Sequence, residues 1–267
     1  MKLTSIIAIA FILGFLAASG CVFGPADKAP ATTSPVPQGE KPHYIIGVDE
    51  NYPPFTYKDD AGNITGIDIE AAKWIAKRQG FDIEFKAVPW DEIIHALQGG
   101  SIDMVYSGMT ITPNRQNEIG FTIPYYTVTK RIAIRSGSNI TMEDLYSGKM
   151  TVGAQAGATG VAWVDANLVQ TGKMPAGQMV LFPDVYTLTE ALVNGTIDAS
   201  ICDTPVQERV IAGKPLVILG EISTGEQYAV AVRKTDHTLL VLMNEGLGAL
   251  LADPYWQELL EKYDLNT

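Results

Sequence analysis

A short pattern that occurs twice in this chain is the strongest constraint on its fold. Residues 96–103 (ALQGGSID) are echoed by residues 191–198 (ALVNGTID), and residues 46–49 (IGVD) are echoed by residues 152–155 (VGAQ). Each copy reads as the end of a helix, a glycine stop, a short strand and a polar loop (residues 107–112 and 202–205). Similarities of eight residues also arise by chance, but two such units predict two α/β lobes that face each other.

The first forty residues differ in composition from the rest. Lys2 precedes a run, residues 6–18, in which every residue is apolar or Gly. Such a run is typical of a signal peptide (residues 1–20) and is too short to cross a bilayer comfortably. Small residues stand directly before Cys21, which favours lipid attachment there over an ordinary signal peptide. Residues 21–41 are rich in proline and poor in apolar residues, so we expect them to be a tether.

Residues 42–267 remain for the folded part, enough for one large or two small domains. The chain has 19 basic and 30 acidic side chains, which argues against nucleic acid and anionic lipid as partners. Cys202 is the only cysteine after Cys21, so no disulfide can form within the folded part of one chain. The three histidines lack metal-ligand spacing, and we expect neither a metal site nor a cofactor.

Strand and helix signals alternate along the first unit. Residues 44–48 and 83–88 read as strands, and helices are expected over residues 68–79, with Asp68 as N-cap, and over residues 91–98. This alternation predicts a parallel sheet with helices on both faces. Ligands of such sheets lie at the carboxyl ends of the strands. That rule places six side chains or loops on one rim: Asp49, Tyr52, Trp90, Gly108, Thr110 and Arg115.

The loop after the strand at residues 102–106 carries groups that suit a carboxylate. Gly108 leaves the backbone bare, Thr110 offers a hydroxyl, and Arg115 offers a planar guanidinium that binds carboxylates in a bidentate manner. Alternatively, this segment binds nothing and is a strand and a turn followed by a solvated arginine.

The second unit offers a matching arrangement. A strand at residues 151–154 runs into the glycine-rich turn 155–160, and a helix is expected to start near Val161. Such a turn exposes backbone N–H groups to a carboxylate or a phosphate, but the P-loop and dinucleotide signatures are absent. Asp203, after the second copy of the repeat, would project into the same space. A cationic clamp facing a carboxylate indicates a site for an α-amino acid.

These motifs resemble the family 3 extracellular solute-binding proteins, the amino-acid receptors of ABC importers. The resemblance covers essentially all of residues 42–267. It rests on residues 52–55 (YPPF), 66–69 (GIDI), 90–91 (WD), 107–113 (SGMTITP) with Arg115, 124–126 (PYY), 152–153 (VG), 157–160 (GATG), 197–199 (IDA) and 203–205 (DTP). Two positions depart from the family pattern: Ala158 stands where Thr is usual, and residues 253–255 read DPY instead of the more frequent DGY.

The resemblance implies roles for particular residues. Arg115, Gly108 and Thr110 would bind the α-carboxylate, joined by Thr159, and Asp203 would bind the α-ammonium. Asp49, Tyr52 and Trp90 would line the pocket for the side chain.

It also implies a fold: the type II periplasmic-binding-protein fold, in which two lobes, each a mostly parallel sheet flanked by helices, are joined by two hinge crossings. Lobe 1 would comprise residues 42–126 and 228–267, and lobe 2 residues 127–227. We expect a monomer, anchored only by lipid to the outer face of the cytoplasmic membrane, that delivers its amino acid to ABC permease subunits and is not an enzyme.

Two other classes of function remain open. Some relatives are dehydratases of prephenate-like acids, but acid–base chemistry needs a positioned His, Glu or Lys, and the pocket loops offer only Asp49, Glu50 and Asp203. A receptor that reports ligand occupancy to a sensor protein is the other class.

For the ligand, a carboxylate at Asp49 between the aromatic faces of Tyr52 and Trp90, with uncharged Gln155 opposite, favours arginine, lysine or histidine over glutamine. Tyr52 and Trp90 would otherwise be core aromatics.

Overall fold

The computed structural model describes residues 41–266, which belong to one compact unit. The predicted signal peptide, Cys21 and all but the last residue of the predicted tether lie outside the described residues. Within residues 41–266, no helix combines the length and the apolar character needed to cross a membrane.

The first of two five-stranded sheets combines both ends of the folded chain. Its strand order is β5 (Asp82–Ala87), β1 (His43–Val48), β6 (Met104–Val105), β13 (Ala231–Val232) and β7 (Gly120–Phe121). Strand β1 is parallel to β5 and β6, whereas β13 is antiparallel to its neighbours. A small sheet precedes the first helix: β2 (Asn51–Tyr52), β3 (Thr56–Lys58) and β4 (Ile64–Thr65).

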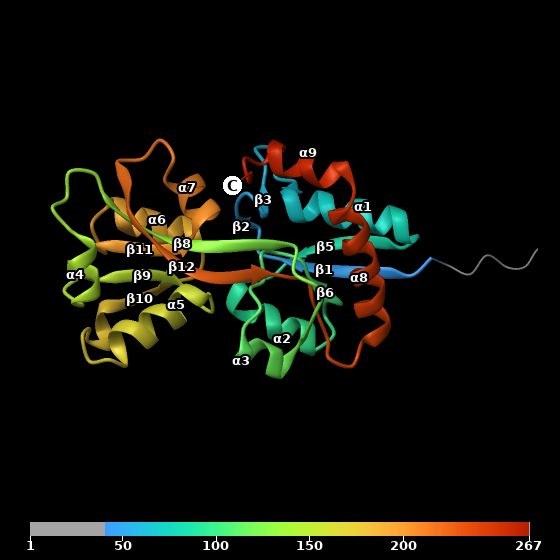
Figure 1. Cartoon of the computed structure of the whole chain (residues 1–267), viewed down its shortest axis with the longest axis horizontal. Coiled ribbons are helices and arrows are strands. Elements are labelled where there is room, and N and C mark those ends of the chain that lie inside the picture. Colours follow the sequence, from blue (N-terminus) through green and yellow to red (C-terminus); the bar gives the residue numbers. More distant parts are fainter. Residues whose placement is uncertain (1–40, 267) are drawn as a thin grey trace, which may run out of the picture. The chain divides into compact units, whose positions relative to one another are not determined.

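Helices pack on both faces of this first sheet. One apolar core joins it to α1 (Ile67–Gln79), α8 (His237–Leu251) and α9 (Pro254–Lys262). A second core joins it to the short helix η1 (Trp90–Glu92), to α2 (Ile93–Gln98) and to the residues that flank α3 (Pro113–Glu118). Figure 1 shows α2 and α3 below the strands and α1 and α9 above them.

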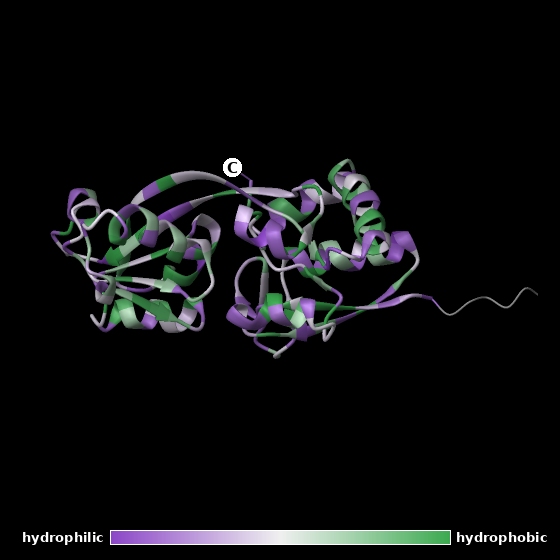
Figure 2. Ribbon diagram, turned by 90° about the horizontal axis from the view of Figure 1, so that it is seen from below, coloured by the Kyte–Doolittle hydropathy of each residue, from purple (hydrophilic) through white to green (hydrophobic). Residues whose placement is uncertain are grey.

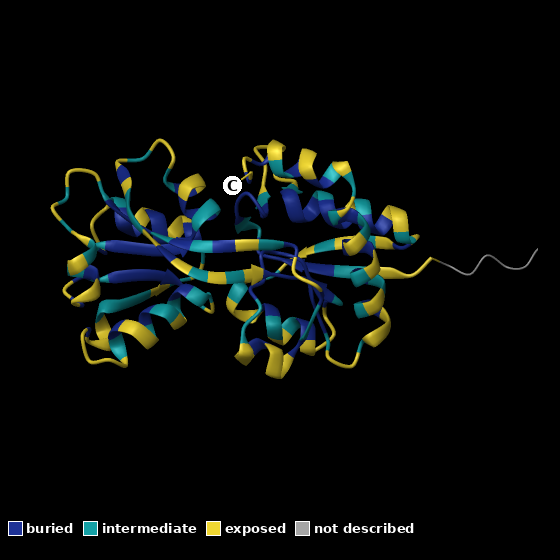
Figure 3. Ribbon diagram, in the orientation of Figure 1, coloured by how far each residue is buried: buried dark blue, intermediate teal, exposed yellow. Residues whose placement is uncertain are grey.

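The second sheet repeats this arrangement with the middle of the chain. Its order is β10 (Met179–Phe182), β9 (Val152–Gln155), β11 (Ala199–Asp203), β8 (Tyr126–Arg135) and β12 (Leu216–Tyr228). Its helices are α4 (Met142–Tyr146), α5 (Thr159–Val164), the π-helical turn η2 (Asp165–Val169), η3 (Ala176–Gln178), α6 (Val185–Val193) and α7 (Thr204–Ile211). Every residue of β9 and β11 is buried, and Figure 3 shows the exposed residues mainly on helices and loops. Apolar and polar residues alternate along the helices (Figure 2), as expected where one face of a helix packs on a sheet.

The two copies of the repeat have the same contacts. A side chain at Gly47 of β1 would overlap Ile102, with a Cβ only 2.3 Å from Ile102 Cδ1. Likewise, a Cβ at Gly153 of β9 would lie 2.5 Å from Ile197 Cδ1. In both sheets a glycine therefore makes room for the isoleucine of the repeat, which explains why these two positions recur together.

The two long strands β8 and β12 pair antiparallel and continue from the second sheet toward the first (Figure 1). Tyr126 pairs with Tyr228 at the end of this ribbon, and the register shifts between Ile222 and Glu226. We expect two hinge segments, residues 125–129 and 224–228; β12 contains the second, and β8 contains the first except for Tyr125. The lobe boundaries themselves stay a prediction.

Three predicted helix starts differ from the structure. The helix expected over residues 91–98 is a 3-10 turn at Trp90–Glu92 followed by α2 from Ile93. Helix α5 begins at Thr159 rather than near Val161, and Gly66, not Asp68, is the N-cap of α1. The Asp68 carboxylate is fully buried instead, and its Oδ2 accepts hydrogen bonds from Gly108 N and Tyr125 Oη, each at 2.8 Å. This carboxylate therefore fixes the loop after β6 rather than the end of the helix.

Candidate functional site

The predicted site residues gather where strands of both sheets end. Asp49 follows β1, and Gly108 and Thr110 lie in the loop after β6. Gln155 and Asp203 are the last residues of β9 and β11 in the second sheet. The carboxyl ends of the parallel strands thus face a common space, the usual ligand position in sheets of this kind.

Asp49 and Gln155, which occupy equivalent positions in the repeat, meet directly. Gln155 Nε2 donates to Asp49 Oδ2 at 2.7 Å, and Asn51 N donates to Asp49 Oδ1 at 2.9 Å. Burial raises the pKa of Asp49 to about 6, although these two hydrogen bonds oppose the shift. A cationic ligand group beside Asp49 would favour its charged form.

A cavity of about 330 Å³ opens beside Asp49. Its lining includes three carboxylates, those of Asp49, Glu50 and Asp184, together with the indole of Trp90. Glu50 comes from the loop after β1, whereas Asp184 is the N-cap of α6 in the second sheet's half. The cavity is therefore lined by acidic groups from both halves, and no basic side chain lines it.

The two predicted pocket aromatics lie parallel. The rings of Tyr52 and Trp90 have centroids 6.3 Å apart and an interplanar angle of 5°. Arg115 lies over Trp90 with its Cζ 5.4 Å from the ring centroid, a cation–π contact. Trp90 is therefore both a wall of the acidic cavity and a support for the arginine.

The position of Arg115 follows from the local sequence. Thr112 is the N-cap of α3 and its Oγ1 accepts from Arg115 N at 3.2 Å, while Pro113 begins the helix. The guanidinium is buried and donates to the main-chain carbonyls of Thr110 and Gly157, both at 2.9 Å. Gly157 belongs to the glycine-rich turn before α5, so Arg115 links the two halves of the site.

Gly108 contributes by its shape. Its φ of +58° is unfavourable for other residues, and a Cβ there would lie 2.9 Å from Tyr52 Cε1. Its N–H donates to the Asp68 carboxylate, as described above, and not toward the space where the strand ends meet. Gly108 therefore lets Tyr52 pack against the loop that carries Thr110.

Asp203 is buried and accepts from three side chains. Its Oδ2 accepts from Tyr52 Oη at 2.6 Å and from Tyr228 Oη, and its Oδ1 forms an ion pair with Lys130 Nζ at 2.6 Å. Burial acts to raise the pKa of Asp203, but the charge and hydrogen bond of Lys130 outweigh it and hold the pKa below the usual value.

Three site residues were missed by sequence reasoning: Tyr228, Lys130 and Glu226. Lys130 Nζ lies 3.1 Å from Glu226 Oε2 and donates to Thr159 Oγ1 at 2.6 Å. Glu226 Oε2 also accepts from Thr159 Oγ1 at 2.7 Å and Thr110 Oγ1 at 3.3 Å. The sequence carried one signal for Lys130. Side chains alternate between the two faces of a strand, so Lys130 lies on the same face as the apolar Val128 and Ile132, which is the buried face.

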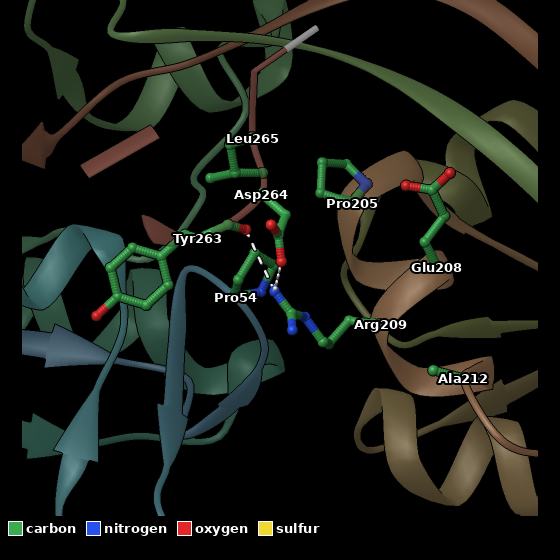
Figure 4. A pocket seen from close by; sticks show the side chains of 8 residues that line it. All are labelled: Pro54, Pro205, Glu208, Arg209, Ala212, Tyr263, Asp264 and Leu265. Carbon is green, nitrogen blue, oxygen red and sulfur yellow. Dashed lines mark hydrogen bonds and ion pairs between the residues drawn. The ribbon is translucent and has the colours of Figure 1, made fainter. Parts of the chain in front are cut away.

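A separate hollow of about 220 Å³ contains none of the predicted site residues. It lies between α7 and the end of the chain, where Arg209 donates to the carbonyl of Tyr263 at 3.2 Å (Figure 4). Among residues 41–266, no group of three or more His, Cys, Asp and Glu side chains is arranged to hold a metal ion.

Comparison with known proteins identifies the class. The chain matches the bacterial extracellular solute-binding proteins, family 3, over residues 44–266. It is 29% identical over 268 residues to a probable histidine-binding protein of Neisseria gonorrhoeae, covering 98% of this chain and 96% of the relative. An arginine-binding protein of an Escherichia coli ABC transporter is 30% identical over 224 residues, covering 82% of this chain and 89% of the relative.

Solved structures agree with this result. An ancestral arginine-binding protein bound to arginine has a TM-score of 0.76 and 32% identity, covering 84% of this chain and 98% of the other. An ancestral amino acid-binding protein described as a precursor of cyclohexadienyl dehydratase has a TM-score of 0.75 and 34% identity, covering 83% and 95%.

The chain therefore belongs to the family 3 extracellular solute-binding proteins and has the type II periplasmic-binding-protein fold. The two relatives compared above are binding proteins rather than enzymes.

Proposed function

We propose that this protein binds a free amino acid between its two lobes and delivers it to an ABC importer. The observation that carries the proposal is the presence of two buried opposite charges in the site: the guanidinium of Arg115, from α3, and the carboxylate of Asp203, at the end of β11. These are the charges that recognise an α-carboxylate and an α-ammonium. The hydroxyls of Thr110 and Thr159 lie within hydrogen-bond distance of the same oxygen, Glu226 Oε2, and would add donors to the ligand's carboxylate.

The proposed ligand has a cationic side chain. Asp49, Glu50 and Asp184 line one cavity with Trp90, and Glu50 is already paired with Lys58 at 2.8 Å. A positive group there would gain an ion pair with Asp49 or Asp184 and a cation–π contact with Trp90. An acidic side chain would be repelled. Histidine- and arginine-binding relatives support this choice, and Gln155 beside Asp49 leaves a neutral amide as the next candidate.

The proposal includes location. Residues 1–20 would direct export, Cys21 would carry lipid at the outer face of the cytoplasmic membrane, and residues 21–41 would act as the tether. The folded part would then divide into lobe 1 (residues 42–126 and 228–267) and lobe 2 (residues 127–227), which close on the ligand. Labelling with a radioactive fatty acid tests the anchor: label lost in a Cys21→Ala variant is expected.

Calorimetric titration tests the ligand. The protein is unfolded, dialysed and refolded to remove any bound molecule, and then titrated with each of the twenty amino acids. We expect arginine, lysine or histidine to bind at least about tenfold more tightly than glutamine, which corresponds to about 1.4 kcal/mol. Tighter binding of glutamine or of a small neutral amino acid would contradict the cationic ligand, and no binding at all would contradict the function. The same preparation is also tested with prephenate and arogenate. We expect it to convert neither, and conversion of either would indicate an enzyme.

A further inference from the structure

We infer that Glu226 occupies the position of the ligand's α-carboxylate in this structure, so that an amino acid binds by displacing it. The inference rests on the proposed function. Glu226 Oε2 accepts hydrogen bonds from the hydroxyls of Thr110 (3.3 Å) and Thr159 (2.7 Å). These are the two hydroxyls assigned above to the ligand carboxylate, one from each half of the site. Both donors are therefore already bound to a carboxylate of the chain itself.

Lys130 supplies the second charged group that an amino acid would bring, an ammonium. Its ammonium lies 2.6 Å from Asp203 Oδ1, the group assigned to the ligand's α-ammonium, and 3.1 Å from Glu226 Oε2. A carboxylate on the two threonines and an ammonium on the aspartate, in direct contact with each other, are the two charged groups of an amino-acid zwitterion. Strands β8 and β12 thus supply an internal substitute for the ligand.

Of the two side chains, Glu226 is the one that is free to leave. The Lys130 side chain is 1% exposed, whereas that of Glu226 is 16% exposed. Glu226 follows Gly225, whose φ is +62°, and stands where the β8–β12 register shifts after Ile222. Because the ladder is interrupted there, the backbone before Glu226 can reorient without breaking regular pairs.

Displacement of Glu226 would assign a new role to Lys130. With Asp203 Oδ1 as its ion-pair partner, Lys130 stays in place and its Nζ becomes a further donor to the incoming carboxylate, beside Arg115, Thr110 and Thr159. Asp203 accepts from three donors at about four acceptor positions, so one position remains for the ligand's ammonium. Binding is then an exchange of one carboxylate for another. The apparent affinity is reduced by the fraction of molecules in which Glu226 fills the site, and the reduction is equal for all amino acids because they share the carboxylate.

A Glu226→Gln variant tests the exchange, because the amide keeps the size of the side chain and removes its charge. We titrate the refolded wild type and variant with L-arginine, L-histidine and L-glutamine. The expected result is about tenfold tighter binding by the variant, with a similar factor for each amino acid that binds, since a neutral amide competes less well for charged donors. Glu226→Ala, which vacates the position, is expected to raise affinity at least as much.

Glu221→Gln is the matched control, because Glu221 lies on the same strand, is exposed and pairs with Arg131 outside the site. It should leave affinity unchanged. Thermal melting without ligand checks folding, and a lower melting temperature of the Glu226 variants is expected because Lys130 loses a partner.

Three results separate this inference from the proposed function. Unchanged or weaker binding by both Glu226 variants, in a protein whose wild type binds amino acids, overturns the exchange and leaves the function standing. A change confined to L-arginine also overturns it, because Glu226 would then act on the ligand's side chain. Absence of binding by the wild type and both variants overturns the proposed function, and the exchange with it.

Discussion

At the scale of single residues, the charged groups at the centre of the site depend on one another. Arg115, Lys130 and Asp203 are each less than a tenth exposed. Burial acts to lower the pKa of Lys130, but Asp203 and Glu226 outweigh it and hold the pKa above its ordinary value. Removing one member of such a pair leaves a buried charge without a partner, which is strongly destabilising. Variants of these residues therefore need separate measurements of stability and affinity.

Arg115→Ala should weaken amino-acid binding by at least about a hundredfold. A desolvated bidentate pair with a carboxylate is worth roughly 3 kcal/mol, and no other guanidinium of the described chain reaches Thr110 or Gly157. Titration calorimetry measures the loss. Arg209→Ala is the control, because Arg209 also donates to a main-chain carbonyl between α7 and the C-terminal segment but lies outside the site. Near wild-type affinity in Arg115→Ala would refute the carboxylate clamp.

Asp68→Asn should change how stability depends on pH. Burial raises the pKa of Asp68 to about 7, well above that of an unfolded Asp, so the folded state holds this proton more tightly. Wild-type stability from this group is thus present at pH 4 and is lost as the pH rises to 7, by up to about 1.4 kcal/mol per pH unit. The variant lacks this contribution. Urea unfolding at several pH values should show that the free energy of unfolding of the variant rises relative to that of the wild type between pH 4 and 7. Parallel plots of this free energy against pH would contradict the prediction.

At the scale of elements, the repeat forms the same clamp in each half. Asp103 Oδ2 accepts from the backbone N–H of Ile45, at the start of the first sheet, and Asp198 Oδ2 accepts from that of Thr151, each at 2.9 Å. An arginine completes each clamp: Arg233 NH1 donates to the carbonyl of Ile102, and Arg135 NH1 to that of Ile197. The aspartate of the repeat therefore joins a helix–strand turn to the neighbouring strand.

Asp103→Ala and Asp198→Ala should each lower the free energy of unfolding, and Asp103→Ala should do so more. The Arg233–Asp103 ion pair measures 2.9 Å, whereas Arg135–Asp198 measures 3.6 Å and is more exposed. We expect about 1–2 kcal/mol for Asp103 and less for Asp198, because solvent screens the second pair. Urea denaturation measures both. Affinity should not change, and a larger loss in Asp198→Ala would argue against clamps of similar construction.

At the scale of the whole molecule, side chains of the site connect the two sheets. Gln155 bonds to Asp49, Arg115 bonds to Gly157 and Tyr52 bonds to Asp203, and in each pair one partner belongs to each half. Such bonds form only when the two halves approach. A ligand that adds further bonds on both sides shifts the population toward this arrangement.

Adding an amino acid that binds should therefore reduce the protein's radius of gyration, measured by small-angle X-ray scattering. It should also stabilise the protein, by about 2.7 kcal/mol at a ligand concentration one hundred times Kd, because only the folded state binds. Scattering and thermal melting are measured on the same refolded sample, with an amino acid that does not bind as control. Superimposable scattering curves at saturation would contradict closure.

The sequence by itself determined the features that depend on short segments. Repeats, glycine stops and alternating strand and helix signals predict the α/β units and place Asp49, Thr110, Arg115 and Asp203 after strands. This was possible because the carboxyl ends of parallel strands meet at one edge, whatever the details of packing.

Only the tertiary structure decided how these residues are paired. Lys130 and Glu226 enter the site because β8 and β12 pair in one register, with a shift after Ile222 that determines the face on which Glu226 stands. A shift of one residue in a strand moves a side chain to the opposite face, so local sequence cannot specify it. Asp68 is a similar case. Local sequence allows it to be an N-cap, but its carboxylate lies in the core, where Gly108 N and Tyr125 Oη donate to it. A buried carboxylate needs such donors, and residues distant in sequence provide them.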